Sequence, residues 1–558
     1  MVEIKEYTFN NEGLEKIESE HNLFGVGSLK NWPVVYIITN DTEAYIGETT
    51  KVNCRIKQHL DNPLRKKLNK VYLLIDNQFN KSATLDAESH LIRYMSADKK
   101  FKLQNGNSGL VAHNYYSRLN YQNKFKNEIW EKLKGVRLVR NELNFIENQD
   151  IFKYSPYTAL DGDQYEIVGK ILEEFHKEDK DKQNLSILIN GGAGTGKTIL
   201  CIYLMKLLSL DREHLEFEND NLKEDLLELR PFVKKVALVI PQQSLRKTLK
   251  RVFKDINGLS PKMVISPNEA AKENYDLLIV DEVHRLRRRV NLVNWHIHDQ
   301  NNKRLNLPKE ATELDWIVRS SKSQLLFYDE NQSIKPTDIK PDYVKEILKN
   351  TKNKVCKYDL TSQFRVLAGE DYIIYIRDLL RCNLTGKKSF ERYDFKLVEN
   401  INNFKKIIIE KDEKFGLARF VAGYAWEWKR KKVDYSYDIE IAGSKFKWNT
   451  NSMDWVNSKN SRTEVGCIHT IQGYDLNYAG VIIGPEISYD EFSNKIVINP
   501  DKYFDRNGKA GLKDKKDELK KYILNIYGVL LTRGIRGTYI YVCDDKLKAY
   551  LSKYIDYL

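Results

Sequence analysis

The stretch that most constrains the fold is Ser186 to Leu208, SILINGGAGTGKTILCIYLMKLL, where a short apolar run leads through a glycine-rich turn into a longer apolar segment. Its glycines, lysine and threonine have the spacing of a phosphate-binding loop. Glycines let successive backbone N–H groups turn inward around phosphates, because no Cβ blocks the positive φ angles required. The stretch therefore predicts a strand, a loop and a helix. The expected nucleotide-binding residues are Gly191, Gly192, Ala193, Gly194, Thr195, Gly196, Lys197 and Thr198.

Within that loop, Lys197 is expected to place its charge on the phosphates, and the Thr198 hydroxyl to coordinate Mg²⁺. Three later apolar runs also end in polar residues: VALVIPQQS (236–244), LLIVDEVH (277–284) and LLFYDENQS (325–333). Doubly wound parallel sheets bind ligands at the carboxyl ends of their strands. We therefore expect Asp281 to hold Mg²⁺, Glu282 to polarise the attacking water and Gln332 to sense the γ-phosphate.

A second block of motifs begins near Val355 and includes LTSQFRV, CIHTIQGYDLNYAGVIIG and YGVLLTRGIRGTYIYV. Arginines at strand or loop ends, here Arg365 and Arg533, are what a two-lobed motor needs to stabilise transition-state charge when its lobes close. Upstream, Gln164 lies just ahead of a helix, where a glutamine can pair with the adenine edge through both its donor and its acceptor.

The phosphate loop, DEVH, DENQ, QFR, HTIQG and LLTRG occur in the order found in superfamily 1 helicases, and their wording most resembles the Schlafen-type helicase domains. The resemblance covers about Tyr154 to Leu558. It implies two RecA-like, doubly wound parallel-sheet lobes with ATP between them, and Arg365 and Arg533 as arginine fingers. By the same resemblance, Thr470 and Gln472 would couple nucleic-acid backbone contact to the nucleotide state.

The N-terminal residues predict a smaller mixed α/β domain. The run WPVVYIITN (32–40) and the short strand Tyr45-Ile46-Gly47 form a hairpin signal. A helix from about Val52 to Leu60 places Arg55 and His59 four residues apart on one face. A later helix carries an apolar stripe of Leu85, Ile92 and Met95, with Glu88 inside it. A carboxylate on a core-facing stripe needs a metal, a partner such as Arg55, or a helix turned the other way.

Taken together, Val34-Val35-Tyr36, Tyr45-Ile46-Gly47, Arg55, His59 and Glu88 resemble the GIY-YIG nuclease family over about Trp32 to Asn114. The resemblance implies that Glu88 holds one divalent metal, Mg²⁺ or Mn²⁺, and that Tyr36 acts as or positions the general base. Arg55 would stabilise phosphorane charge, Tyr45 and His59 would assist in positioning or proton transfer, and Asn114 would match a family asparagine. Val34 departs from the family, because a glycine is usual at that position.

Composition favours a polyanionic partner. The net charge is +13, with basic clusters at Lys66-Lys67, Lys99-Lys100, Arg287 to Arg289 and Lys429 to Lys432. Tryptophans and lysines between Phe415 and Trp455 suit either base stacking or core packing. No run has the length of a membrane helix and no signal-peptide pattern opens the chain, so we expect a cytoplasmic protein without a membrane partner. The six cysteines have no CxxC spacing, which disfavours disulfides and zinc.

We therefore expect an α/β chain with a nuclease domain at 1–120, a helical connector at 121–153, a first RecA-like lobe at 154–350 and a second at 351–558. The expected function is an ATP-dependent DNA helicase or translocase fused to a metal-dependent endonuclease, in phage defence or DNA repair. Two alternatives remain: a nucleotide-sensing switch that gates the nuclease without unwinding, and an inactive nuclease fold that only binds DNA. RNA also remains possible, because motor motifs read nucleic-acid backbones.

Overall fold

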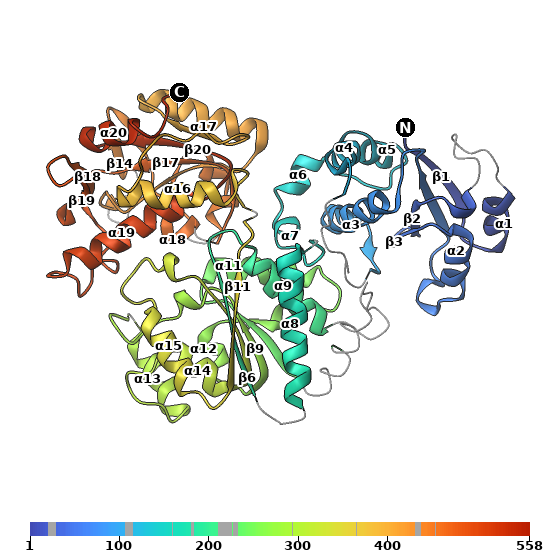
Figure 1. The fold of residues 1–558 in the computed structure, drawn as a ribbon, viewed down its shortest axis with the longest axis horizontal. Coiled ribbons are helices and arrows are strands. Elements are labelled where there is room, and N and C mark those ends of the chain that lie inside the picture. Colours follow the sequence, from blue (N-terminus) through green and yellow to red (C-terminus); the bar gives the residue numbers. More distant parts are fainter. Residues whose placement is uncertain are drawn as a thin grey trace. The chain divides into compact units, whose positions relative to one another are not determined.

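The computed structural model describes residues 1–558 except 20–28, 106–114, 159, 180–183, 210–225, 227–232, 293, 364, 430–436, 452–453 and 472 (Figure 1). The chain divides into two compact units. The first comprises residues 1–176, 202–231 and 251–261, and the second comprises residues 177–201, 232–250 and 262–558.

The first unit is built on a five-stranded mixed sheet in the order β1-β4-β2-β3-β5. Its strands are β1 (Glu3–Thr8), β2 (Val34–Thr39), β3 (Glu43–Thr49), β4 (Lys70–Ile75) and β5 (Lys102–Leu103). The predicted hairpin is present as the antiparallel pair β2–β3, in which Tyr36 lies opposite Gly47. β1 and β2 both run antiparallel to β4, and β5 runs parallel to the outer side of β3.

Alternate residues of β2 divide between two cores, as expected for a strand buried on both faces. Val34, Tyr36 and Ile38 join one core with α1 (Asn11–Ser19) and α2 (Val52–Asp61), whereas Val35 and Ile37 join the other with α3 (Lys81–Asp98). Helix α2 confirms the predicted helix that carries Arg55 and His59. Ile92 and Met95 of the predicted apolar stripe are buried in this core and Leu85 is half-buried, while the buried side of α3 also includes Ala87, Leu91 and Tyr94.

The stretch expected to be a connector, 121–153, is helical but shares the core on the α3 side of the sheet. It contains α4 (Arg118–Lys124), a π-helical turn (Phe125–Ile129), α5 (Trp130–Gly135), α6 (Leu143–Glu147) and α7 (Asp150–Lys153). Phe125, Trp130 and Phe152 pack in the same cluster as Val35 and Ile37. The expected boundary at 120 therefore cuts through one hydrophobic core. Helix α8 (Gly162–Asp179) follows.

The second unit contains two parallel sheets. The first has the order β11-β6-β10-β9-β7-β8, and every pair within it is parallel. Its strands are β6 (Leu185–Gly191), β7 (Val236–Val239), β8 (Val264–Ile265), β9 (Tyr275–Val280), β10 (Ser321–Tyr328) and β11 (Lys354–Leu360). Its helices are α9 (Lys197–Ser209), α11 (Gln243–Lys254), α12 (Pro267–Ala270), α13 (Trp295–Arg304), α14 (Glu313–Ser320) and α15 (Pro341–Asn350).

The second parallel sheet has the order β12-β20-β17-β13-β16. Its strands are β12 (Asp394–Leu397), β13 (Ala418–Ala422), β16 (Val465–Cys467), β17 (Leu476–Ile483) and β20 (Gly534–Val542). Hydrophobic clusters cover both faces, with α17 (Ile401–Phe415) on one and α16 (Gly369–Arg381), α18 (Ile468–Ile471), α19 (Lys516–Leu531) and α20 (Asp545–Ser552) on the other (Figure 1). Two hairpins flank it, β14 (Ile439–Ile441) with β15 (Ser444–Phe446), and β18 (Ile487–Asp490) with β19 (Lys495–Ile498).

The expected α/β class with parallel sheets is confirmed, but the boundary between the two lobes lies later than residue 350. Strand β11 pairs in parallel with β6, from Lys354 opposite Leu185 to Leu360 opposite Gly191. The first lobe therefore ends after β11, at the loop that carries Arg365. Among the described helices, none combines the length and the apolarity that a membrane crossing requires. All six cysteines are free thiols.

Candidate active sites

The phosphate loop joins β6 to α9 as the sequence predicts. Gly194 and Gly196 adopt φ angles of +85° and +77°, which glycine tolerates because it has no Cβ. The Lys197 ammonium is buried and donates to the carbonyl oxygens of Gly191 and Gly192 at 2.6 and 2.7 Å. The loop thus gathers its glycines and its cation in one turn at the carboxyl end of β6.

Thr198 and Asp281 meet directly, since the Thr198 hydroxyl donates to Asp281 Oδ2 at 2.6 Å. Burial, followed by the nearby charge of Glu282, raises the pKa of Asp281 to about 6. Burial would also raise the pKa of Glu282, but His284, whose Nε2 lies 2.8 Å from Glu282 Oε2, and Lys197 outweigh it and lower that pKa. A hydroxyl and a carboxylate at this spacing suit Mg²⁺, which prefers hard oxygen ligands.

Glu282 is also one of the few non-glycine residues with a left-handed backbone, at φ +56°. Such conformations cost free energy and concentrate at functional sites, where the surrounding structure enforces them. This observation favours a functional role for the DE pair over ordinary packing.

Gln332 reaches the phosphate loop through Asp329, a residue that the sequence analysis did not single out. Gln332 Nε2 donates to Asp329 Oδ2 at 2.6 Å, and the same oxygen lies 3.7 Å from Lys197 Nζ. Asp329 follows β10 directly, so its position at a strand end was a signal available in the sequence.

Gln363 is a second residue that the sequence analysis missed. Its amide donates to the carbonyl of Ala193 in the phosphate loop, and its Oε1 accepts from the Arg365 backbone N–H at 2.7 Å. A Cβ placed on Gly194 would lie 2.1 Å from Gln363 Oε1 and 2.8 Å from the Arg365 Cβ. Gly194 therefore allows the QFR segment to lie against the loop. Gln363 lies two residues before Arg365 in the QFR motif, and this position was its signal in the sequence.

Both arginines expected as fingers are held by the loop 473–475. Arg365 Nε donates to Asp475 Oδ1 at 2.5 Å. Arg533 is almost fully buried, and its Nη1 donates to the Tyr474 carbonyl at 3.3 Å. In this conformation Arg533 is part of the second lobe's interior. A finger role for Arg533 requires the loop 473–475 to move.

The expected nucleic-acid contacts are placed only in part. Thr470 is buried, and its hydroxyl donates at 2.9 Å to the carbonyl of Cys467, the last residue of β16 before its own helix α18. Gln472 lies outside the described residues. The neighbouring His469 is exposed and is held by Asp505, with Nε2 and Oδ2 2.9 Å apart. In the HTIQG motif, therefore, His469 presents a polar group to the surface, whereas the Thr470 hydroxyl is engaged internally.

Gln164 begins α8 in the first unit, where it is buried. Its backbone N–H donates to Asp161 Oδ1 at 2.7 Å, and its Oε1 accepts from the Asp161 N–H at 3.3 Å. This reciprocal pair satisfies two N–H groups at the helix start. Gln164 thus acts as a helix cap here, and an adenine contact remains a proposal.

The first unit gathers four of its five predicted catalytic residues, which we call the tyrosine cluster: Tyr36, Tyr45, Arg55 and His59. The Tyr36 hydroxyl and His59 Nε2 are 2.9 Å apart, and Arg55 Nε donates to the same hydroxyl at 3.3 Å. The ring of Tyr45 lies 4.8 Å from that of His59. Because α2 places Arg55 and His59 one turn apart, both reach the tyrosines of β2 and β3.

The tyrosine cluster has an additional cation that the sequence analysis did not identify. The guanidinium of Arg65 lies 3.9 Å from the centroid of the Tyr45 ring, and Arg65 Nη1 donates to Gln104 Oε1 at 2.7 Å. Burial, followed by the charges of Arg55 and Arg65, lowers the pKa of His59 to about 3. His59 is therefore a neutral imidazole at physiological pH.

Two further residues set the geometry around the YIG segment. A Cβ on Gly47 would lie 2.2 Å from the Tyr36 hydroxyl, so the ring of Tyr36 occupies the space that any other side chain would need. The buried Asn105 accepts from the N–H of Ile46 at 3.1 Å and donates to its carbonyl at 2.8 Å, continuing the sheet past β5. The sequence analysis proposed Asn114 for the family asparagine, and that residue lies outside the described residues.

Glu88 is placed on α3, where it is half-buried between Thr84 and Ile92 on neighbouring turns. The Thr84 hydroxyl donates to Glu48 Oε2 at 3.1 Å, which ties this face of α3 to β3 just after the YIG segment. Glu88 therefore lies on the face of α3 nearest β3. Val34, where the family has a glycine, is buried in the core on the α2 side.

Arg287 to Arg289, expected as a candidate nucleic-acid contact, have partners within their own lobe. Arg287 binds Glu313 through both its backbone N–H and Nε at 2.8 Å, and Arg289 Nε binds Asp299 at 2.5 Å. Arg288 donates to the carbonyls of Pro336 and Asp338. These contacts hold the segment after the DE pair, and carboxylates neutralise two of the three arginines, Arg287 and Arg289.

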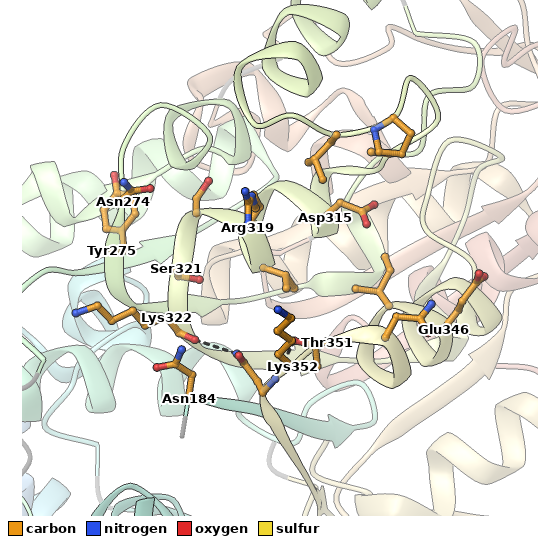
Figure 2. Close-up of a pocket in the computed structure, with 18 of the residues that line it drawn as sticks. Asn184, Asn274, Tyr275, Asp315, Arg319, Ser321, Lys322, Glu346, Thr351 and Lys352 are labelled. Atoms are coloured by element: carbon orange, nitrogen blue, oxygen red, sulfur yellow. Dashed lines mark hydrogen bonds between the residues drawn. The ribbon is translucent and has the colours of Figure 1, made fainter. Parts of the chain in front are cut away.

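A cavity of about 990 Å³ lies at the other edge of the first parallel sheet, where the strands begin (Figure 2). Asn184, Tyr275 and Ser321, at the starts of β6, β9 and β10, line it. Its charges are mixed, and Lys322 is paired with Asp276 at 2.8 Å. Since nucleotides bind at the carboxyl ends of parallel strands, this cavity is not the nucleotide site.

Comparison with known proteins agrees with the motor motifs. Residues 185–544, more than half of the chain, match the family described as Schlafen group 3, DNA/RNA helicase domain. The uncharacterized protein YPL245W of Saccharomyces cerevisiae is 28% identical over 399 residues, covering 66% of this chain and 84% of the yeast protein. The family match begins at Leu185, so strands β1 to β5 lie outside it.

Similar solved structures include helicases. The arterivirus nonstructural protein 10 helicase has a TM-score of 0.28 and 12% identity, over 68% of this chain and 64% of that chain, slightly under two thirds of its length. A Bacteroides Pif1 helicase in complex with ADP-AlF3 and ssDNA has a TM-score of 0.25 and 9% identity, over 66% of this chain and 91% of that chain. At these TM-scores the likeness carries no further argument.

Proposed function

Because the chain belongs to the Schlafen group 3 DNA/RNA helicase family, we propose that its second unit is an ATP-driven helicase or translocase on DNA and its first unit a GIY-YIG-type endonuclease. The family assigns helicase-type ATPase activity to residues 185–544. The preference for DNA, the nuclease and a role in phage defence or DNA repair are our proposals.

The observation that carries the motor proposal is the meeting of Lys197, Thr198 and Asp281 at the carboxyl ends of β6 and β9. Lys197 would bind the β- and γ-phosphates, and Thr198 with Asp281 would hold Mg²⁺. The metal would neutralise charge that develops on the transferred phosphoryl group. Glu282, which His284 and Lys197 keep ionised, would orient the attacking water.

Closure of the two lobes would then complete the ATP site. Arg365 now binds Asp475, and Arg533 binds the Tyr474 carbonyl, so one movement of the loop 473–475 would release both arginines. Gln332 would report the γ-phosphate through Asp329 to Lys197. This sequence of contacts links hydrolysis to the relative position of the lobes.

The nuclease proposal rests on the chain of hydrogen bonds Arg55–Tyr36–His59. The Tyr36 oxygen accepts from Arg55, and His59 is neutral, so the Tyr36 hydroxyl can donate a hydrogen bond to His59 Nε2. Tyr36 would position the attacking water and its general base, and Arg55 would stabilise the phosphorane. A divalent metal, Mg²⁺ or Mn²⁺, held by Glu88 would supply Lewis-acid stabilisation of that charge.

The test is metal-dependent cleavage of plasmid and single-stranded DNA by wild type, Glu88→Ala and Lys197→Ala, each with and without ATP. We expect Glu88→Ala to abolish cleavage and keep ATPase activity, and Lys197→Ala to lose ATPase activity and the ATP response of cleavage. Glu12→Ala, which removes an exposed ion pair with Lys16, is the matched control and should behave as wild type.

Other outcomes would select the alternatives. If ATP gates cleavage by the wild type, and Glu88→Ala does not displace a DNA strand, the motor is a nucleotide switch. DNA-stimulated ATPase activity without cleavage under any metal or nucleotide condition would make the first unit a DNA-binding module. Tighter binding of RNA than of a matched DNA strand in competition would reassign the substrate.

A further inference from the structure

We propose that a groove beside α17 binds single-stranded nucleic acid as a second contact surface, in addition to the HTIQG motif. The groove has a volume of about 750 Å³ and is lined by α17, by the end of the β14–β15 hairpin and by residues 460–464. We call it the α17 groove. Its key residues are Lys405, Lys445, Lys447, Tyr437, Phe446 and Glu464. The proposal rests on the nucleic-acid activity proposed above.

The lining of the α17 groove contains three lysines and one carboxylate, that of Glu464, and Glu440 lies opposite Lys445 across the β14–β15 hairpin. Within the described part of the chain, Lys405, Lys445 and Lys447 have no carboxylate partner within 4.0 Å. Burial lowers the pKa of Lys405. The groove's carboxylate, Glu464, is buried and already accepts the Thr450 N–H at 2.8 Å and the Trp455 indole N–H at 3.0 Å. A polyanion would supply the missing negative charge.

Two of these lysines lie beside aromatic rings. Lys405 Nζ is 4.1 Å from the centroid of the Phe446 ring, and Lys447 Nζ is 5.8 Å from that of Tyr437. Tyr437 is 48% exposed, so its ring offers a face to a ligand. Lysines beside an exposed aromatic ring can bind phosphates while a base stacks, and this combination is typical of single-strand binding surfaces.

The contrast with the other basic segments strengthens the choice of this groove. Arg287 and Arg289 are bound to Glu313 and Asp299, and Lys406, the neighbour of Lys405, is 3.9 Å from Glu410. Among the described residues, the lysines of the α17 groove have no carboxylate within 4.0 Å; Lys445 lies on β15 and Lys447 directly follows that strand. They therefore present charge to a ligand that follows the groove.

The test is fluorescence anisotropy of labelled dT20 and rU20 oligonucleotides with the full chain. The variants are the triple substitution Lys405→Gln, Lys445→Gln and Lys447→Gln, the single substitution Tyr437→Ala, and Lys406→Gln as the matched control. Each lost phosphate contact should lower the slope of log affinity against log salt by about 0.7, so the triple variant should lose about 2 in slope. Loss of a stacked base in Tyr437→Ala should weaken binding by roughly 5- to 100-fold.

ATP hydrolysis without nucleic acid should remain at the wild-type rate in all variants, because none of these residues belongs to the nucleotide site. Equal affinity and equal salt slope in the triple variant and in Lys406→Gln would overturn the groove while leaving the nucleic-acid activity intact. Failure of the wild type to bind either oligonucleotide would overturn both. Poly-glutamate serves as a third probe. If the triple variant loses poly-glutamate binding but binds both oligonucleotides like the wild type, the groove binds an acidic polypeptide and the proposal is overturned.

Discussion

The imidazole of His59 is enclosed by the rings of Tyr36 and Tyr45 and by the charges of Arg55 and Arg65. Burial and these two cations disfavour the imidazolium, so the folded protein keeps the ring neutral far below its ordinary pKa of 6.5. The same residues that keep His59 neutral, so that its Nε2 can accept a hydrogen bond from Tyr36, therefore make the first unit sensitive to acid.

We predict that the free energy of unfolding of the first unit decreases as the pH falls, because of His59. The unfolded chain binds a proton near pH 6.5, whereas the folded chain does so only near pH 3. Above pH 6.5 His59 therefore makes its full contribution to the free energy of unfolding. Below pH 6.5 that free energy falls by about 1.4 kcal/mol per pH unit, which amounts to about 2 kcal/mol at pH 5. Hydrogen exchange of peptides spanning residues 34–49, corrected for intrinsic rates, should show this loss in wild type but not in His59→Asn. Equal pH slopes in the two proteins would contradict the prediction.

At the scale of single elements, the phosphate loop shows how a turn depends on its surroundings as well as on its motif. Gly194 has a positive φ and lies against Gln363 and Arg365, whereas nothing lies within 4 Å of a Cβ placed on Gly192. The two glycines look alike in the sequence motif, but neighbouring residues leave no room for a side chain only at Gly194.

We therefore predict opposite results for two alanine substitutions. Gly194→Ala should displace Gln363 and strain the loop, at a cost of roughly 1–3 kcal/mol, and should weaken binding of a fluorescent ATP analogue at least 10-fold. Gly192→Ala should bind the analogue within about 3-fold of wild type, because its Cβ meets open space. Similar affinities for the two variants would show that Gln363 does not constrain the loop.

The sequence predicted local elements well, because apolar runs and glycine turns are local signals. The β2–β3 hairpin, α2, and the strand, loop and helix around Lys197 are present where expected. It assigned β11 to the wrong lobe, because Lys354 to Leu360 pair with β6, more than 150 residues earlier. Such pairing has no local signature, and neither does the burial of Thr470 and Arg533 by neighbours distant in sequence.

At the scale of the whole molecule, the two lobes of the second unit contact each other next to Gln332, the residue that we propose senses the γ-phosphate. Asn525 of α19 donates through Nδ2 to the carbonyl of Ser333 at 2.8 Å, one residue after Gln332. Lys340 and Glu518 form a more exposed ion pair at 3.1 Å. Helix α19 then leads to Arg533, so a single rigid element connects Ser333 to an expected arginine finger.

We predict that Asn525→Ala uncouples the lobes. A hydrogen bond of this kind contributes about 0.5–1.5 kcal/mol, so nucleic-acid-stimulated ATP turnover should fall by roughly 2- to 12-fold while nucleotide affinity stays near wild type. Lys340→Ala is the control and should have a smaller effect, because exposed ion pairs contribute little. Wild-type turnover by Asn525→Ala, or an equal loss in both variants, would contradict a coupling role for α19.

The sheet order also fixes when each site can exist during synthesis. The hydrophobic core around the first sheet extends to Tyr157, whereas β6 gains its two neighbours only when β10 and β11 are complete, near residue 360. At ~5–20 residues per second, the ribosome needs roughly 10–40 s to add the about 200 residues between these points. A nascent chain can therefore form the tyrosine cluster well before it can bind ATP. During that interval, any restraint on the cluster must come from outside the motor.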